Sequence, residues 1–413
     1  MTAPLRRFLR DTGSVSPVIG TVLVLAITVL GIASILYWGA PTIDRIQSRN
    51  SQTAMEGEFE GLRDASQELS VPDHSRFPTI AMPGGSLSVA QGTRFMVTVD
   101  ADAANPNCDF HVTDWSDTSG ANLAKVTVAG TNCGRTIVNC GAGAPGAGQA
   151  CLEVYSVGTS SLVKQSIPIT SCPVTPTAVT CITPTVQTPT PATNVDFSQG
   201  DWMFQLTDGA TTTPVVYAQA WLHSNDQVAW KLKSSSGVWE DYLDGGAIFS
   251  RTGSTYYLEK EAPIGDTAFG PAYVGLWLRT FKATGYGAID GQGSHQLFLS
   301  LKGNSVRSDL TAAYRLRYDF GGGLAQPWCN ALLFRDAHLT NSATPALYIA
   351  AYKQDPALTC TTGGAGADSL GLRSVCYTQF AAVATAPANT CTTAGTAFRF
   401  RFLHARIDAS LSI

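Results

Sequence analysis

Oxygen-bearing side chains crowd one short stretch of the sequence. Asp100, Asp102, Asn105, Asn107 and Asp109 follow one another closely, and carboxylate and amide oxygens are the ligands that calcium accepts. Their spacing is not that of an EF-hand loop, and Asp and Asn also stabilise turns by bonding their own backbone. We therefore expect a turn here, and the sequence predicts no metal ligand.

Cysteine is the second residue type that could carry chemistry. No CxxC pair occurs and no histidine stands at zinc-finger spacing from a cysteine pair, which argues against a metal centre. An even number on the far side of a hydrophobic segment favours disulfides, with buried free thiols as the alternative. The ten candidates form a group of six and a group of four: Cys108, Cys133, Cys140, Cys151, Cys172 and Cys181, then Cys329, Cys360, Cys376 and Cys391.

Catalytic and nucleotide-binding motifs are weak or missing. The segment 141–146 fits GxGxxG, but no strand-to-helix unit surrounds it, and HExxH, Walker A and GxSxG motifs do not occur. The net charge of -4 and the pI near 5.9 provide no basic field for nucleic acid. We expect no enzyme, no cofactor and no nucleic-acid partner.

Tryptophan is dense between residues 202 and 277. A stacking surface for glycans is one interpretation, and the filling of a β core is the other, which aromatic residues more often do. The residues concerned are Trp202, Trp221, Trp230, Trp239 and Trp277. Surface glycans are therefore kept as a possible partner.

The first structural element that the sequence predicts is a hydrophobic helix near the N-terminus. Val18 to Ala40 is a run of 23 residues without a charge, about 35 Å of helix and enough to cross a bilayer. The leader charges Arg6, Arg7 and Arg10 favour a cytoplasmic N-terminus and send the rest outside. The sequence thus predicts a single-pass membrane segment.

The helix is expected to continue beyond the apolar run. Its start is predicted at Ser16 and Pro17, because proline in the first turn loses no hydrogen bond. Downstream, an amphipathic pattern reaches about Val71. Its apolar positions are Met55, Phe59, Leu62 and Leu69.

The segment Ser14-Val15-Ser16-Pro17-Val18-Ile19-Gly20-Thr21-Val22-Leu23 resembles the N-terminal signature of archaeal type IV pilin-like proteins. The resemblance covers about the first 70 residues. It implies that a prepilin peptidase removes the basic leader, between Ser14 and Val15 or, as the runner-up, after Gly13. The sequence departs from the family pattern in that Thr12-Gly13-Ser14 follows the charged Asp11. An ordinary signal anchor that is never cut is the alternative.

Beyond the helix, alternating apolar and polar residues predict strands. The fold class expected is α+β, a long N-terminal helix followed by mainly antiparallel β-sandwich-like extracellular domains. The clearest strand candidates are Ser86–Ala90, Arg94–Asp100, Ala124–Ala129, Leu152–Ser156, Ser161–Ile169, Trp202–Leu206, Val215–Leu222, Gln227–Leu232, Tyr273–Phe281, Gln296–Leu301, Tyr314–Phe320 and the alternating Phe398, Phe400 and Phe402.

The expected domain organisation follows from these patterns. It comprises a leader (1–14), a helix (15–71), a cysteine-rich β domain (72–170), a Pro/Thr-rich linker (171–195) and a larger β-sandwich-like domain (196–413). An alternative keeps 72–100 with the C-terminal domain and makes 101–195 an insertion.

The resemblance implies a structural or adhesive subunit of a surface filament, minor or tip-located because the body is large. Its expected partners are the prepilin peptidase, the membrane before assembly, and other pilin-like subunits through the helix. The alternative is a solitary membrane-anchored binding protein, lectin-like, that does not polymerise.

Overall fold

The computed structural model describes most of the helix and of the β-rich body. Its described residues are 17–69, 74–102, 110–117, 124–130, 136–138, 145–158, 161–165, 169–171, 179–182, 185–186, 193–194, 201–210, 212–261, 267–268, 273–285, 287–313, 315–322, 324, 327–328, 349–351, 372–379 and 398–412. The predicted leader and cut lie outside them, with Arg6, Arg7, Arg10, Gly13, Ser14, Val15 and Ser16.

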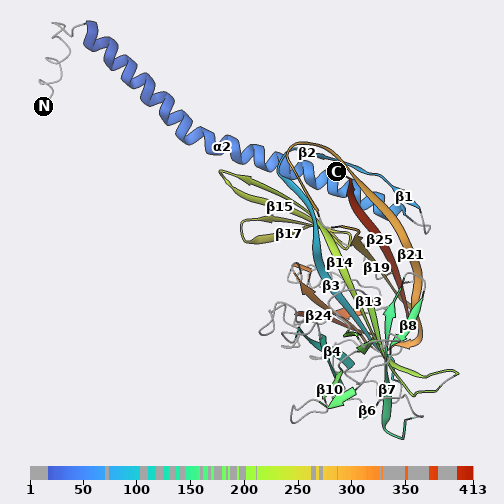
Figure 1. Cartoon of the computed structure of the whole chain (residues 1–413). Coiled ribbons are helices and arrows are strands. Elements are labelled where there is room, and N and C mark those ends of the chain that lie inside the picture. The colour runs from blue at the N-terminus through green and yellow to red at the C-terminus, as the bar shows by residue number, and fades with distance from the viewer. Residues whose placement is uncertain are drawn as a thin grey trace, which may run out of the picture.

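One long helix, α2 (Pro17–Glu68), projects from one end of the body (Figure 1). Pro17 is its first described residue, and it runs through Pro41 without interruption. The large apolar side chains between Val18 and Ile46 are 53% to 77% exposed. By length and composition this helix could cross a membrane.

The second half of α2 packs on the body with one face. Residues on this face recur every three or four positions, which is the spacing of one side of a helix. The buried residues are Ser48, Gln52, Met55, Phe59, Leu62 and Ser66, followed by Leu69 just beyond the helix. The predicted burial of Met55, Phe59, Leu62 and Leu69 is confirmed.

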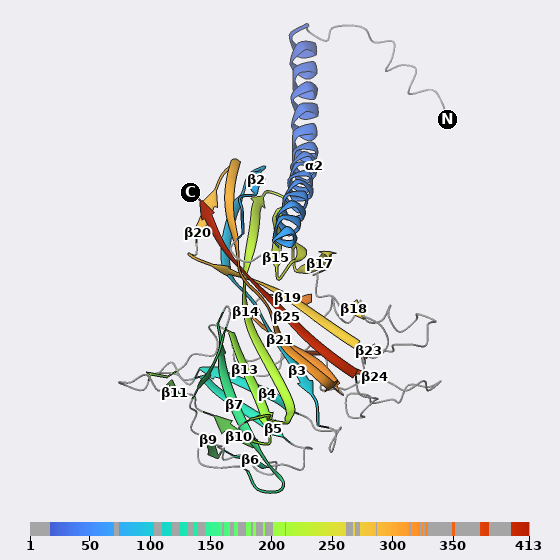
Figure 2. The same cartoon turned by 90° about the vertical axis from the view of Figure 1, so that its right-hand side faces the viewer.

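A smaller sheet covers one side of the body. Its order is β1 (Ser75–Arg76), β21 (Gly293–Ala313), β25 (Phe398–Ser412), β19 (Tyr273–Ala283) and β18 (Thr267–Ala268), with β2 (Thr79–Met82) also on β21. All its pairs are antiparallel except β19 with β25. Its long strands extend away from the helix (Figure 2).

A larger sheet lies opposite. Its main path is β17 (Thr255–Lys260), β16 (Ala247–Thr252), β15 (Gly237–Asp244), β14 (Val216–Ser234), β3 (Ser86–Asp100), β22 (Arg315–Gly322), β24 (Leu372–Gln379) and β23 (Ile349–Ala351). The strands off this path are β13 (Asp201–Thr207), β7 (Gln149–Val157), β6 (Thr136–Val138), β8 (Leu162–Gln165) and β20 (Gly287–Asp290). The chain is therefore α+β, with one apolar helix followed by mainly antiparallel sheets.

Further strands lie at the end of the body away from the helix (Figures 1 and 2). One sheet has the order β4 (Phe110–Asp117), β5 (Ala124–Gly130), β10 (Val179–Ile182) and β9 (Ile169–Ser171), and a separate pair joins β11 (Thr185–Val186) to β12 (Thr193–Asn194). Strands β10, β11 and β12 fall within the predicted linker.

Strand pairing also bears on the division of the body. β3 is bonded to both β14 and β22, so residues 86–100 share a sheet with the C-terminal part of the chain. β7 joins the same sheet through β13. The division into separately folding domains stays a prediction.

Two predicted strand breaks are wrong. The segments expected on either side of Gln91-Gly92-Thr93 form the single strand β3, and those on either side of residues 223–226 form β14. The two irregular stretches face each other, with a register shift between Ser224 and Asp226. A Cβ atom on Gly92 would lie 3.0 Å from the Gln227 nitrogen, so glycine here permits a close approach of two strands inside a sheet.

Side chains from both sheets fill two cores. The helix-side core joins Met55 and Phe59 of α2 to residues such as Trp230 and Ile407. The distal core, farther along the strands, contains Trp221, Phe249, Trp328, Phe400 and Phe402 among others. Trp202, Trp221 and Trp230 are buried, as the core interpretation of the tryptophans requires.

Candidate functional site

The first feature that could carry function is the exposed apolar half of α2. Apolar surface contributes about 25 cal/mol per Å² when it leaves water, and a contiguous exposed apolar surface of this kind marks a membrane or protein contact. Polar side chains on this half form hydrogen bonds with the backbone of the same helix. Thr28 Oγ1 and Ser34 Oγ each donate to the carbonyl oxygen four residues earlier. The segment therefore offers apolar packing and no charge.

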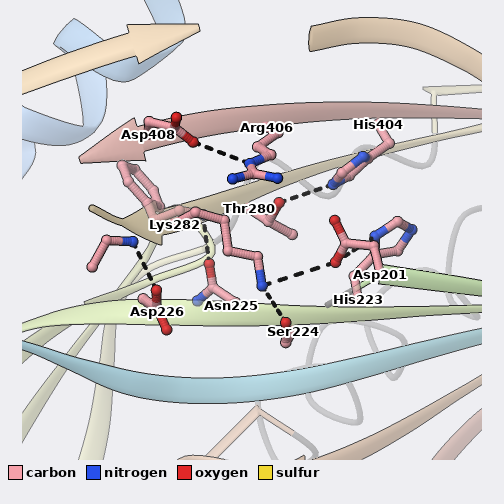
Figure 3. Close-up of polar contacts among 12 residues, drawn as sticks. Asp201, His223, Ser224, Asn225, Asp226, Thr280, Lys282, His404, Arg406 and Asp408 are labelled. Carbon is pink, nitrogen blue, oxygen red and sulfur yellow. Dashed lines mark hydrogen bonds and ion pairs between the residues drawn. The ribbon is translucent and has the colours of Figure 1, made fainter. Parts of the chain in front are cut away.

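The second feature is a buried polar layer between the two cores. In two strands the inward-facing positions change between odd and even residue numbers on the way from one core to the other. In β14 they include Trp221 in the distal core and Val228 in the helix-side core, and in β25 they include Phe402 and Ala405 in the same two cores. The alternation is therefore shifted by one residue in both strands. Register shifts accompany the slip in β14 and in β21. Irregular pairing leaves backbone groups without ladder partners, and polar side chains gather at this level (Figure 3).

Two side chains of β14 supply acceptors to the backbone of β19. Asn225 Oδ1 accepts a hydrogen bond of 2.7 Å from the Phe281 nitrogen, and Asp226 Oδ2 accepts one of 2.7 Å from the Ala283 nitrogen. β14 and β19 belong to different sheets. A buried amide without a partner costs about 1–3 kcal/mol, so these bonds connect the sheets where ladder pairing cannot.

Asp244 at the end of β15 completes this layer. Its Oδ2 accepts from Thr93 Oγ1 at 2.6 Å and from the Thr93 nitrogen at 3.1 Å, and its Oδ1 accepts a short bond from Asn225 Nδ2. Burial raises the pKa of Asp244 to about 6, against the opposing effect of these donors. The carboxyl group thus fixes the irregular stretches of β3 and β14 together.

A histidine pair occupies the centre of the layer. His223 on β14 and His404 on β25 stack with ring centroids 4.0 Å apart and planes inclined by 26°. His404 Nε2 lies 2.9 Å from Thr280 Oγ1. Asp201 Oδ1 lies 3.3 Å from His223 Nδ1 and 3.9 Å from Lys282 Nζ, and Lys282 donates a short bond to Ser224 Oγ.

The donor set invites comparison with a metal centre. Asp201, His223 and His404 offer ligand atoms within 4.8 Å of one another, and two imidazoles with a carboxylate suit zinc or iron. However, a histidine binds a metal in the plane of its ring, and two stacked rings whose centroids are 4.0 Å apart and whose planes differ by only 26° do not direct nitrogen lone pairs at one ion. The Lys282 cation would also oppose a divalent ion. The residues do not fit a metal as they lie.

The same residues do not make a hydrolytic triad. A triad requires a nucleophile in contact with the histidine nitrogen that faces away from the carboxylate. His223 Nε2 has no hydrogen-bond partner among the described residues, and Ser224 Oγ is engaged by Lys282. The arrangement supports a structural role.

The charges of this layer respond to burial and to one another. Burial opposes ionisation of Asp201, but His223 and Lys282 hold the pKa of its carboxyl well below the ordinary value. Burial, reinforced by His223, lowers the pKa of His404 well below 6.5. The folded layer therefore holds His404 neutral.

Acid is expected to destabilise the body through His404. Because the folded pKa is depressed, this contribution is complete above pH 6.5 and is lost as pH falls below it. A single group that stays neutral in the folded state lowers the free energy of unfolding by about 2 kcal/mol between pH 6.5 and pH 5. Because the raised pKa of Asp244 acts in the opposite direction, the loss should be measured by denaturant titration in detergent as a difference between two proteins: acid should lower the free energy of unfolding of the unmodified chain relative to that of His404→Asn. The exposed His74→Gln serves as control, and an equal acid response in all three proteins would contradict the assignment.

Other predicted site residues are placed as follows. Pro17 is the first described residue of α2, so the predicted helix start stays a prediction, and Cys151 is buried and disulfide-bonded. The side chains of the other cysteines, and Asn105, Asn107 and Asp109, lie outside the described residues, whereas Asp100 and Asp102 are buried. The expectation that Asp100 to Asp109 form a turn stays a prediction.

The histidine pair was missed by sequence reasoning. A signal existed, because His223 continues the inward alternation of Trp221, and His404 continues that of Phe400 and Phe402. A histidine in phase with buried aromatic residues is a buried histidine. The pairing of the two strands' histidines across the sheets was not available from sequence.

Comparison with known proteins bears on the N-terminal part. Residues 14–118, less than half of the chain, match the model of a Family of unknown function (DUF7289). No curated protein and no solved structure matches the chain. The match includes α2 and strands β1 to β4 and carries no activity with it.

Proposed function

We propose that this chain is a structural or adhesive subunit of an archaeal type IV pilus-like surface filament, in a minor or tip position. The observation that carries the proposal is a single helix with two different halves. The first half exposes apolar side chains throughout, and the second half is docked on a large β body. The same helix can thus lie in a membrane first and in a helical bundle later.

The surface of the first half of α2 suits a helix that leaves the lipid and packs against other helices. Neither environment tolerates isolated charge, and α2 has no acidic residue in its first turn. Gly20 and Gly31 have no neighbouring atom within 4 Å of an added Cβ, which leaves room for close approach of other helices. Assembly would then rest on apolar packing.

The leader explains how assembly would be controlled. Arg6, Arg7 and Arg10 precede the apolar segment, and each charge at the centre of an apolar bundle costs about 2.5–3.5 kcal/mol or more. Prepilin peptidase would remove them between Ser14 and Val15. The family match begins at Ser14, in keeping with this boundary.

The body supports display outside the cell. Its two large sheets contribute to common cores, in keeping with a β-sandwich-like extracellular part, and Cys151 is disulfide-bonded, which suits an oxidising compartment. Its size favours a minor or tip subunit over the bulk subunit. Surface glycans are retained as a class of ligand.

Blocking the cut tests this function. The double variant Gly13→Leu, Ser14→Leu should accumulate as a longer membrane-bound chain, and its content in sheared filaments should fall by about tenfold or more, since retained charges oppose entry. Ala3→Leu, Pro4→Leu changes the leader away from the cut and should assemble normally. If the uncut double variant enters filaments as well as this control, the proposed dependence of assembly on processing is wrong. If the unmodified chain is found only in the membrane and never in filaments, the chain is better described as a solitary anchored binding protein.

A further inference from the structure

The contact between helix and body contains a carboxyl group with no matching cation. Asp241 of β15 is fully buried beneath α2, where its Oδ1 accepts a 2.9 Å hydrogen bond from Gln52 Nε2. Its Oδ2 has no hydrogen-bond partner among the described residues. A buried ionised carboxylate with one donor is strongly disfavoured unless it is paired or protonated.

Charged side chains occur on both elements that place a like charge near this carboxyl, α2 and β17. They are Arg49, Glu56, Glu60 and Arg63 on α2, and Glu259, Lys260 and Glu261 on or just after β17. Glu56 and Glu259 act on Asp241 as like charges. The acidic groups therefore lie on both sides of the contact between helix and body.

The nearby cations are engaged elsewhere. Lys260 Nζ pairs with Glu60 Oε1 at 3.0 Å. Arg63 donates to the carbonyl oxygens of Gly246 and Glu261 at 3.0 and 3.1 Å. Arg49 acts on Glu56, and no described cation forms an ion pair with Asp241.

We propose that protonation of Asp241 controls how firmly the second half of α2 is docked on the body, so that acid tightens the contact and mild alkali loosens it. The proton removes the charge that the buried site cannot solvate and that Glu56 and Glu259 repel. This inference goes beyond the function proposed above and does not depend on membrane insertion or assembly.

The titration range supports a response near neutrality. Burial, reinforced by Glu56 and Glu259, raises the pKa of Asp241 to about 7 against the Gln52 bond. Burial and the neighbouring glutamates also raise the pKa of Glu56. Because the docked pKa lies above the ordinary one, docking is strongest below pH 3.8, weakens as pH rises toward 7, and levels off above it.

Other polar contacts keep the helix attached at both ends. Asp44 Oδ2 accepts from the Ser236 nitrogen at 2.9 Å, and Arg279 Nη1 donates to the Ser66 carbonyl at 3.0 Å. Asp241 lies between these contacts through Gln52. The response is therefore a local loosening of the middle of the contact.

Hydrogen exchange of the full chain in detergent tests the proposal. After correction for intrinsic exchange, protection of amides in residues 48–62 should fall by about tenfold to a hundredfold between pH 5 and pH 8, as linkage to one proton predicts. Asp241→Asn keeps an acceptor for Gln52 without a charge and should remain protected across this range. Asp64→Asn, on the same helix but exposed, should behave like the unmodified chain.

A second variant covers the case in which Asp241→Asn does not fold. Glu56→Gln removes one repelling charge at the rim of the contact, so the loss of protection should level off at a lower pH. Protection that is independent of pH in the unmodified chain, or a fall of the same size and midpoint in the folded Asp241 or Glu56 variant, would overturn the proposal.

Discussion

Replacing Phe59 by alanine should detach much of α2 from the body. Phe59 is fully buried in the helix-side core, with Met55 and Leu62 on the same face. Truncation of a buried phenylalanine costs about 3–5 kcal/mol through lost burial and the cavity left behind. In detergent, amides of residues 48–68 should lose protection while the apolar first half remains embedded.

The control for this experiment is Thr53→Ala, on the exposed side of the same turns. It should change protection and thermal stability little, because it removes no buried contact. Equal effects of the two variants would mean that helix propensity, and not the packed face, holds the helix on the body.

The second large effect is expected at Asp244. Asp244→Ala removes the acceptor of three hydrogen bonds and leaves Thr93 and Asn225 donors buried without partners. Each orphaned group costs about 1–3 kcal/mol, so a loss of about 3 kcal/mol or more in unfolding free energy is predicted. Denaturant titration at neutral pH measures it.

Asp244→Asn is the matched variant. It retains one carbonyl oxygen in nearly the same shape, and should therefore lose clearly less than the alanine variant. Equal losses would assign the effect to the charge of the side chain, and not to the number of donors that it satisfies.

The sequence was most informative where one periodicity ran without interruption. The uncharged run from Val18 to Ala40 and the spacing of Met55, Phe59 and Leu62 predict the helix and its buried face. These signals are local, because neighbours along a helix face are close in sequence. The alternating residues of Phe398 to Phe402 predict the start of β25 for the same reason.

The sequence was least informative where distant strands meet. Gln91-Gly92-Thr93 has the composition of a turn, but in the fold it is an irregular stretch opposite residues 224–227 of β14. Only the partner strand and the acceptor Asp244 make a continuous strand favourable there. No local pattern contains that information, and the polar layer depends on the same long-range pairing.

The two functional features also differ in what they require. The exposed half of α2 needs no tertiary contact to be recognised, whereas the Asp241 contact needs α2, β15 and β17 in place together. The first concerns where the chain resides and the second how the body is held on its helix. Each can fail experimentally without the other.

The mass of the native N-terminal peptide tests the central claim most directly. Protein taken from sheared surface filaments and from the membrane of the same cells should be digested and its first peptide identified. The account predicts a filament chain that begins at Val15, or at Ser14 if the runner-up cut is used, with the leader present only in the membrane fraction. Filament protein that retains residues 1–14, or a chain found uncut and confined to the membrane, would contradict it.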